Sequence, residues 1–266
     1  MFKHKRNIFR PTALLVGVFL CFFPTFTIGA NAEYRPIKNW DLLSGYSTYF
    51  SETDVGRSQN IRIAAALIDG VIVQAYGDFS FNQTVGRRTA EAGFQQAKII
   101  VDGQYVLGVG GGVCQVSTTL YNAAIKSGLT VTEYHPHTLQ VSYIPPSRDA
   151  MVSTGSDLCF FNPYPHPVRL CASVEKGCVR VRFYGKNTGE RIEIVSVERE
   201  TLPPPPPIVK DGDEDGVLRQ EKSGLKSEAY IERYRGNALI ERKRLRKDEY
   251  RPVQGIIVKK IQNTEE

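Results

Sequence analysis

Beyond its first thirty residues, the sequence lacks a long hydrophobic run. No stretch after Ala32 approaches the roughly 18 apolar residues that a membrane-spanning helix needs. We therefore expect no membrane span in the body of the chain. With 41% hydrophobic and 23% charged residues among its 266, the chain has the composition of an ordinary globular protein with one good-sized core.

Acidic residues are absent from the first 32 positions. Four basic residues (Lys3, Lys5, Arg6 and Arg10) precede an apolar run that ends at Ala30-Asn31-Ala32, an A-x-A cleavage site. The run is short for a spanning helix and Pro24 interrupts it, so this order predicts a cleaved signal peptide over residues 1–32. Retention as an N-terminal membrane anchor is the alternative. Either way, we expect an extracytoplasmic protein, secreted or associated with the cell envelope.

A strong charge of one sign is also missing. The formal net charge is +6, but four of the 34 basic residues and none of the 28 acidic ones lie in the signal, which leaves about +2. The basic balance is thus partly a targeting feature and gives little support for nucleic acid as a partner. We expect no nucleic-acid partner, and contact with a membrane only through an uncleaved signal.

Periodic segments predict an α+β fold with a mixed, mainly antiparallel sheet, a cysteine-bearing helix and a small all-β unit at the end. Apolar spacing of three and four predicts helices over 59–68 and 115–127, the second ended by Gly128. Alternation predicts a strand pair over 71–81, a hairpin over 97–107 that turns at Asp102-Gly103, a strand over 130–144, and further strands over 158–182.

The domain boundaries follow from composition. We predict a main domain over 34–197, a Pro-rich and acidic linker over 198–224, and a small β unit over 225–262. The run DGDEDG opens like a calcium loop, but Lys222 stands where the loop needs a glutamate, so we interpret it as a solvated linker. In the β unit we expect a hairpin turn at Gly236-Asn237 and a third strand over 250–259. Its basic residues predict a solvated strand face, with attraction to an anionic polymer as the alternative: Arg242, Lys243, Arg244, Arg246 and Lys247.

The stretch GVGGGVC, residues 108–114, lacks what a nucleotide-binding loop needs. Val113 stands where a dinucleotide fingerprint requires glycine, and the lysine of a P-loop is missing. We assign Gly110, Gly111 and Gly112 instead to unusual dihedral angles and to close approach of a substrate backbone. Cys114 then lies at the start of the predicted helix, where free N–H groups and the helix dipole stabilise a thiolate and lower its pKa.

Histidine is scarce, so a close histidine pair stands out. The sequence has only four histidines; His135 and His137 are two apart on a predicted strand and would share one of its faces. Either can act as the base for Cys114, while the N–H of Gln115 can stabilise an oxyanion. A cysteine on a helix followed by a histidine on a strand is the order found in papain-like hydrolases.

Three interpretations of Cys114 remain open. It is a nucleophile, a structural cysteine that packs the turn or pairs with Cys159, or one ligand of a zinc site with His135 and His137, for which no fourth ligand is evident. Arg148-Asp149 also has two interpretations. Arg148 can bind a substrate carboxylate and Asp149 can orient a histidine, or the two can form a local ion pair or turn cap.

Cys171 and Cys178 flank a predicted hairpin turn. We expect them to form a disulfide across it, as a staple without a chemical role.

Three stretches together resemble the VanW family: GDFSFNQTVGRRTAEAGF (77–94), GVGGGVCQVSTTLYNAA (108–124) and HPHTLQVSYIPPSRDA (135–150). The resemblance extends over residues 34–197, and the chain from Ala229 resembles the β modules called G-five domains. VanW-family proteins occur in bacterial cell envelopes, and one is encoded within a vancomycin-resistance cluster. The resemblance implies an exported bacterial protein at peptidoglycan but brings no established reaction. One departure is Ser147, which stands where the family usually has glycine.

The residues and the resemblance give one set of site predictions. The catalytic candidates are Cys114, His135, His137 and Gln115. The substrate-binding candidates are Gly110, Gly111, Gly112, Ser117, Arg148 and Asp149. We expect no cofactor and no metal, and peptidoglycan or its stem peptides as partner. Whether the protein is an enzyme stays open. It is a Cys-His hydrolase or transpeptidase of stem peptides, or a non-catalytic wall-binding module with a structural cysteine, with the zinc site as the third possibility.

Overall fold

The computed structural model describes residues 40–101 and 103–260. The predicted signal peptide and Asp102 therefore lie outside the described residues. Three helices and fifteen strands fill the described part, and every strand pair except β11 (Ile208–Gly212) with β15 (Ile256–Lys260) is antiparallel. The predicted α+β class with mainly antiparallel sheets is confirmed. Within these residues, no helix combines the length and the apolar character that crossing a membrane requires.

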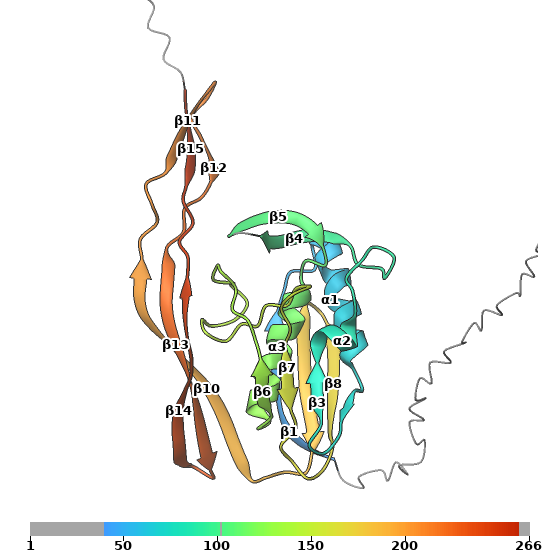
Figure 1. Cartoon of the computed structure of the whole chain (residues 1–266). Helices are drawn as coiled ribbons and strands as arrows, with labels where there is room; N and C mark the ends of the chain where they lie inside the picture. Colours follow the sequence, from blue (N-terminus) through green and yellow to red (C-terminus); the bar gives the residue numbers. More distant parts are fainter. Residues whose placement is uncertain (1–39, 102, 261–266) are drawn as a thin grey trace, which may run out of the picture. The chain divides into compact units, whose positions relative to one another are not determined.

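Helix α3 (Val113–Lys126) lies at the centre of the core and contacts α1 (Val55–Ile68), β1 (Asp41–Tyr49) and β9 (Cys178–Gly185) (Figure 1). The apolar residues that gave the spacing are completely buried: Val116, Leu120, Ala123 and Ala124. Gly128 follows the helix with φ +77°, the left-handed conformation that ends many helices. The sequence pattern thus placed the cysteine-bearing helix correctly.

Helix α1 begins four residues earlier than its apolar spacing predicts. The side chain of Asp54 accepts a hydrogen bond from the backbone N–H of Arg57 at 3.0 Å, and this cap starts the helix at Val55. The predicted face of Ile61, Ala64, Ala65 and Ile68 is buried against the core. Asp54 and Arg57 thereby come to lie at the end of α1 that borders the glycine loop.

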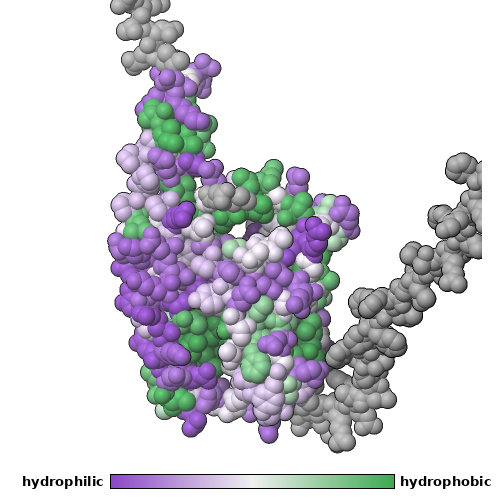
Figure 2. All heavy atoms as spheres, in the orientation of Figure 1, coloured by the Kyte–Doolittle hydropathy of each residue, from purple (hydrophilic) through white to green (hydrophobic). Residues whose placement is uncertain are grey.

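The two short strands predicted to pair with each other over 71–81 pair instead with strands that are distant in the sequence. The hairpin of β4 (Gln96–Val101) and β5 (Gln104–Val109) is confirmed, with Gly103 at φ +74°. Strands β2 (Ile72–Val73) and β3 (Asp78–Ser80) do not pair with each other. They join β8 (Val168–Glu175) and β7 (Cys159–Phe161), and Phe81 opens the short helix α2 (Phe81–Val85). Exposed apolar side chains on β5 give the hairpin a hydrophobic surface (Figure 2).

The predicted strand over 130–144 is correct only for its first four residues, Thr130–Glu133, which form β6. Strand β6 ends at Glu133, and the residues from Tyr134 to Ala150 form irregular structure. Pro136 has no N–H to donate to a ladder, and the N–H of His137 donates instead to the side chain of Asp149 at 2.7 Å. His135 and His137 consequently do not share a strand face.

The C-terminal strands form two sheets. Strand β10 (Glu190–Leu202) pairs with β13 (Gly224–Arg235), which turns at Gly236-Asn237, as predicted, into β14 (Ala238–Tyr250). Strand β10 crosses the predicted boundary at residue 197. The expected linker contains β11 and β12 (Gly216–Arg219), which both pair with β15, so the predicted third strand belongs to this second sheet and not to the hairpin. The domain boundaries themselves stay predictions.

The predicted disulfide between Cys171 and Cys178 is wrong. The turn at Lys176-Gly177 sets a register in which Cys171 lies opposite Arg182, while Cys178 lies opposite Glu175. The two cysteines are therefore four rungs apart, about 13 Å along the hairpin. Cys114, Cys159, Cys171 and Cys178 are all free.

Candidate active site

Cys114 is positioned by the glycine loop of residues 110–112, which packs closely against β4 and α1. A Cβ on Gly111 would lie 2.6 Å from the carbonyl oxygen of Lys98 on β4, and one on Gly112 would lie 3.0 Å from Ile61 on α1. Gly112 also has φ +104°, which disfavours any side chain. The glycines are thus required for packing, and this packing fixes where α3 begins. Cys114 follows as the second residue of α3, with its Sγ 3.4 Å from the carbonyl oxygen of Val152.

His137 is buried beside this cysteine and held in one orientation. Its Nδ1 lies 2.7 Å from Oδ2 of Asp149, which also accepts the backbone N–H of His137. Burial lowers the pKa of His137, but its contacts with Asp149 and Cys114 outweigh burial and raise the pKa to about 9. The imidazole is therefore protonated at neutral pH, with Nε2 left for Cys114 and for a substrate.

The charge of His137 in turn affects the pKa of the Cys114 thiol. Burial raises the pKa of Cys114, but the hydrogen bond and charge of His137, a backbone hydrogen bond of Val152 and the charge of Arg88 together bring it below its ordinary value. Cys159 has the opposite environment, because burial and the carboxylates of Asp157 and Glu133 raise its pKa to about 12. The environment of Cys114 thus favours the thiolate more than that of an ordinary cysteine does, whereas the environment of Cys159 disfavours it.

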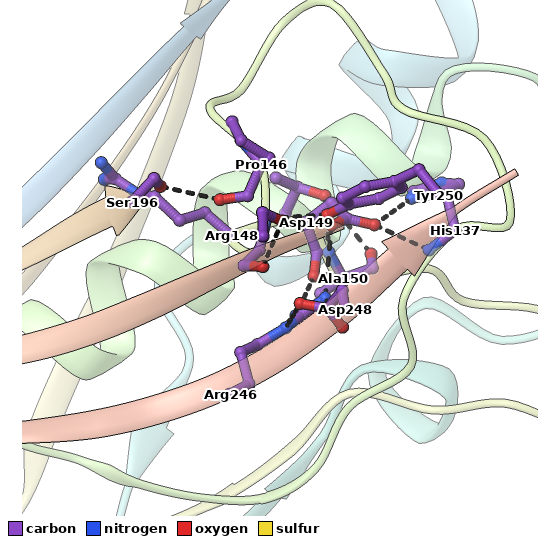
Figure 3. A network of polar contacts seen from close by, with 12 residues as sticks. His137, Pro146, Arg148, Asp149, Ala150, Ser196, Arg246, Asp248 and Tyr250 are labelled. Atoms are coloured by element: carbon purple, nitrogen blue, oxygen red, sulfur yellow. Dashed lines mark hydrogen bonds and ion pairs between the residues drawn. The ribbon is translucent and has the colours of Figure 1, made fainter. Parts of the chain in front are cut away.

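Asp149 completes a Cys114–His137–Asp149 arrangement and is held from strand β14 (Figure 3). Its Oδ1 accepts the hydroxyl of Tyr250 at 2.6 Å and lies 3.3 Å from Nη2 of Arg246. Burial raises the pKa of Asp149, but His137 and Arg246 outweigh burial and lower the pKa to about 2. The carboxylate stays ionised and can keep the imidazole charged and oriented.

A groove of about 960 Å³ gives access to Cys114 and His137. It lies among the glycine loop, the β4–β5 hairpin, the start of α1, and residues 141–143 and 151–154. Gly110, Gly111 and Gly112 all line it. The groove is large enough to hold a short peptide beside the thiol, a volume typical of ligand sites.

Comparisons with known proteins identify the family of the segment that carries this site. Residues 56–184 match the VanW family, described as VanW like protein. The chain carries a VanW-like domain. "Uncharacterized protein YoaR" of Bacillus subtilis (strain 168) is 43% identical over 146 residues, which are 54% of this chain and 48% of that protein. The match therefore spans about half of the relative's length.

One solved structure also aligns with the chain. The structure titled "Crystal structure of HP0197-G5" covers 26% of this chain and 96% of its own, at 19% identity and a TM-score of 0.16. At that score the alignment supports no conclusion, so the G-five character of the C-terminal strands stays a prediction.

Within the VanW-like domain, Gln115 is a structural residue and not an oxyanion donor. Its backbone N–H donates to the carbonyl oxygen of Gly112 at 2.9 Å, so it is not available to a substrate. Its side chain is 1% exposed, accepts Nη2 of Arg57 at 2.6 Å and donates to Thr48. In the described part of the chain, the N–H of Cys114 itself has no acceptor.

Ser117 and Arg148 also lie away from a substrate. Ser117 is buried and donates to the carbonyl oxygen of Ala150 at 2.6 Å. Arg148 donates to the side chain of Asn122 at 2.9 Å and stacks on Tyr46, outside the groove lining. Both side chains hold the loop that carries Asp149 against α3, so their predicted role in substrate binding is replaced by a role in positioning that loop.

His135 is separated from the cysteine. Its Nε2 lies 2.9 Å from Oε1 of Glu133, and His135 is not among the residues that line the groove. The ligand set suggested for zinc is therefore not assembled. Among the residues that the structure describes, no three His, Cys, Asp or Glu side chains are grouped as a metal site.

Sequence reasoning missed Arg246 and Tyr250. Arg246 was predicted to be solvated with its basic neighbours, but it is buried, with Nε 2.7 Å from Asp248 and Nη1 2.6 Å from the carbonyl oxygen of Asp149. The available signal was the alternation of Arg246, Asp248 and Tyr250 along β14, which places all three on one face.

Ser147 adopts φ +58°, which explains the glycine expected at this position. Its N–H donates to the hydroxyl of Tyr250 at 2.7 Å, and its own hydroxyl lies 2.7 Å from that of Ser227. Strands β13 and β14 thus hold the serine in a conformation that it adopts at some cost.

Proposed function

We propose that this protein is an exported cell-envelope enzyme whose Cys114 attacks a carbonyl of a peptidoglycan stem peptide. The observation that carries the proposal is the Cys114–His137–Asp149 arrangement at a groove of peptide size. Export is supported by the character of residues 1–32. The choice of peptidoglycan is supported by the family resemblance.

The reaction begins with the thiolate. Sγ of Cys114 bonds to the carbonyl carbon, and the electron pair of the C=O bond moves to oxygen, next to the free N–H of Cys114. As the C–N bond breaks, Nε2 of His137 gives its proton to the leaving amine, and a thioester remains on Cys114. His137 is suited to this step because Asp149 holds its Nδ1.

The second half of the reaction regenerates the site. Water or a second amine attacks the thioester carbon, and Nε2 of His137 accepts its proton. The C–S bond then breaks and returns the thiolate beside an imidazolium. Water gives hydrolysis and an amine gives transpeptidation; both use the same residues, and the structure favours neither.

The test combines reactivity with product analysis. The chain without residues 1–32 is treated with iodoacetamide from pH 4 to 10, and each cysteine is mapped by mass spectrometry. We expect Cys114 to react at pH values well below those needed by an ordinary thiol, whose pKa is about 8.5, and Cys159 to stay unmodified. In a separate sample that has not been alkylated, solubilised muropeptides should give a thioester on Cys114, visible as added mass on the intact protein.

Two variants make the test decisive. Cys114→Ala should abolish the thioester and any cleavage or cross-linking of muropeptides, while Cys159→Ala, as the matched control, should retain both. If Cys114→Ala keeps full activity, or if Cys114 reacts no faster than Cys159, the nucleophile is elsewhere. Binding of muropeptides without a thioester would reject the catalytic proposal in favour of a wall-binding module.

A further inference from the structure

The groove beside Cys114 is lined by four cationic side chains: Arg57, Arg87, Arg88 and Lys98. Within the described residues, none of the four forms an ion pair with an acid. The arginines of the β10–β13–β14 sheet behave differently. Arg199 and Arg244, for example, both pair with Glu228. The cations at the groove thus have no acidic partner among the described residues, while the arginines of this sheet are paired with neighbouring acids.

Acids contribute little to balance this charge. Asp54 is the acidic residue of the groove lining, and its Oδ1 already accepts the N–H of Arg57 as the cap of α1. Asp157 lies near enough to Arg88 to affect its pKa, but its two oxygens accept bonds from Ser80, Asn82 and Leu158. With His137 also charged, the groove carries a net positive charge next to Cys114.

Of these four side chains, Arg88 is the one whose charge acts on the reacting sulfur. Its Nη2 donates to Oδ1 of Asn82 at 2.6 Å, and its guanidinium lies 5.8 Å from the ring centre of Phe81. Burial lowers the pKa of Arg88, and the charge of Cys114 acts in the opposite direction, which places the two groups within electrostatic reach. Asn82 and Phe81 thus hold the guanidinium in place without neutralising it, and several of its N–H donors stay available.

Arg57 is held in a similar way. Its Nη2 donates to Oε1 of Gln115 at 2.6 Å, and its guanidinium lies 6.0 Å from the ring centre of Tyr143. Both guanidinium groups are therefore oriented by neutral partners. A planar guanidinium fork matches the two oxygens of a carboxylate, and a pre-oriented fork loses little side-chain entropy when it binds one.

We propose that this wall is a carboxylate subsite, where Arg88, assisted by Arg57, binds a carboxylate of the acyl donor close to the carbonyl that Cys114 attacks. The inference rests on the proposed function and adds a requirement to it. The donor must carry a free carboxylate near the reacting amide, so an otherwise identical donor with that carboxylate amidated is a poor substrate.

Two alkylating reagents that differ only in charge test the subsite. Iodoacetate and iodoacetamide both react by displacement of iodide, with formation of a C–S bond to the thiolate. The ratio of their rates at one cysteine cancels the thiolate fraction, so it reports on the binding of the carboxylate. We expect this ratio at Cys114 in the folded chain to exceed that in the urea-unfolded chain by about tenfold, a value suited to one charge-assisted contact.

Variants locate the effect. Arg88→Gln should reduce the ratio to that of the unfolded chain, and Arg57→Gln should reduce it in part. Arg62→Gln is the matched control, because Arg62 lies on the same helix as Arg57 but pairs with Glu52 and does not line the groove. Equal ratios in the folded wild-type chain and in Arg88→Gln would overturn the subsite.

A second measurement does not depend on a reactive thiol. N-acetyl-D-alanine and its amide are titrated into Cys114→Ala while the Nε–H signals of the arginines are followed by NMR. The acid should shift the Arg88 signal and the amide should not. If Cys114 reacts with neither reagent but the acid still binds at Arg88, the proposed catalysis fails and the subsite stands. If neither compound shifts the signal, the subsite is rejected.

Discussion

The hydroxyl of Tyr250 donates to Oδ1 of Asp149 at 2.6 Å, across 101 residues of sequence. This bond and the contacts of Arg246 join strand β14 to the residue that orients His137. The candidate site is therefore not contained in residues 56–184, which match the VanW family. Its third residue depends on a strand that lies outside the matched segment.

Replacement of Tyr250 tests whether Asp149 and its loop depend on strand β14. In Tyr250→Phe, Asp149 loses a donor and the buried N–H of Ser147 loses its acceptor. A buried group without a partner costs about 1–3 kcal/mol, so we expect the free energy of unfolding in urea to fall by about that amount. Tyr234→Phe is the control, since its hydroxyl bonds Glu232 on the same sheet and does not contact Asp149 or Ser147. Equal stabilities of the two variants would contradict the expectation.

The charge of Asp149 should set the titration of His137. In Asp149→Asn the carboxylate that raises the pKa of His137 is gone, while burial still lowers it. We expect the NMR midpoint of the His137 ring to fall from about 9 toward the ordinary 6.5, and alkylation of Cys114 to require a higher pH. Asp248→Asn is the control, because Asp248 bonds Arg246 and not His137. A midpoint that stays near 9 would show that Asp149 is not the cause.

The pKa shifts of Asp149 and His137 predict how the free energy of unfolding depends on pH. The pKa of Asp149 is lowered to about 2 in the folded chain, so its stabilising effect is present above the ordinary 3.8 and lost as pH falls through 2. The pKa of His137 is raised to about 9, so its effect is present below 6.5 and lost as pH rises through 9. The stability difference between wild type and Asp149→Asn should be largest between about pH 4 and 6.5. Urea unfolding at pH 3, 5 and 9.5 measures it, and a difference independent of pH would reject the assignment.

Local pattern predicted the elements that carry the nucleophile but not the contacts that complete the site. Spacing of three and four placed α1, which buries one face, and α3, whose apolar residues follow the same spacing although nearly the whole helix is buried. Alternation suggested a strand for His135 and His137, but Pro136 between them lacks the N–H that strand pairing needs. A pattern of alternating apolar residues does not reveal that missing donor. The pairing of Arg246 with Asp149 spans 97 residues, so no local pattern encodes it. Cys171 and Cys178 were misjudged because spacing alone does not fix the register of a hairpin.

The glycine loop gives a prediction about packing. Gly112→Ala adds a Cβ at φ +104°, within 3.0 Å of Arg57 and Ile61 on α1. The left-handed conformation costs about 1–3 kcal/mol, and the contact with α1 adds to it. Gly70→Ala is the control with φ +79° and nothing within 4 Å of the new Cβ, so it should show the conformational cost alone. Thermal unfolding compares the two variants. An equal loss of stability in both would mean that close packing of α1 against the loop adds no cost at Gly112.

Two truncations separate the C-terminal sheets. A chain that ends at Leu202 lacks β13 and β14, so Asp149 loses Arg246 and Tyr250 and the buried face of β10 loses its partner strand. We expect this chain to lose the low-pH reactivity of Cys114, together with much of its stability. A chain that ends at Val253 keeps β13 and β14 and lacks only β15, whose partners β11 and β12 contribute no residue to the groove. It should retain the reactivity of Cys114 toward iodoacetamide at pH 6, measured by mass spectrometry. If the shorter chain stays reactive, β14 is dispensable for the site; if the longer chain loses reactivity, the β11–β15–β12 sheet supports the site in a way that its contacts do not explain.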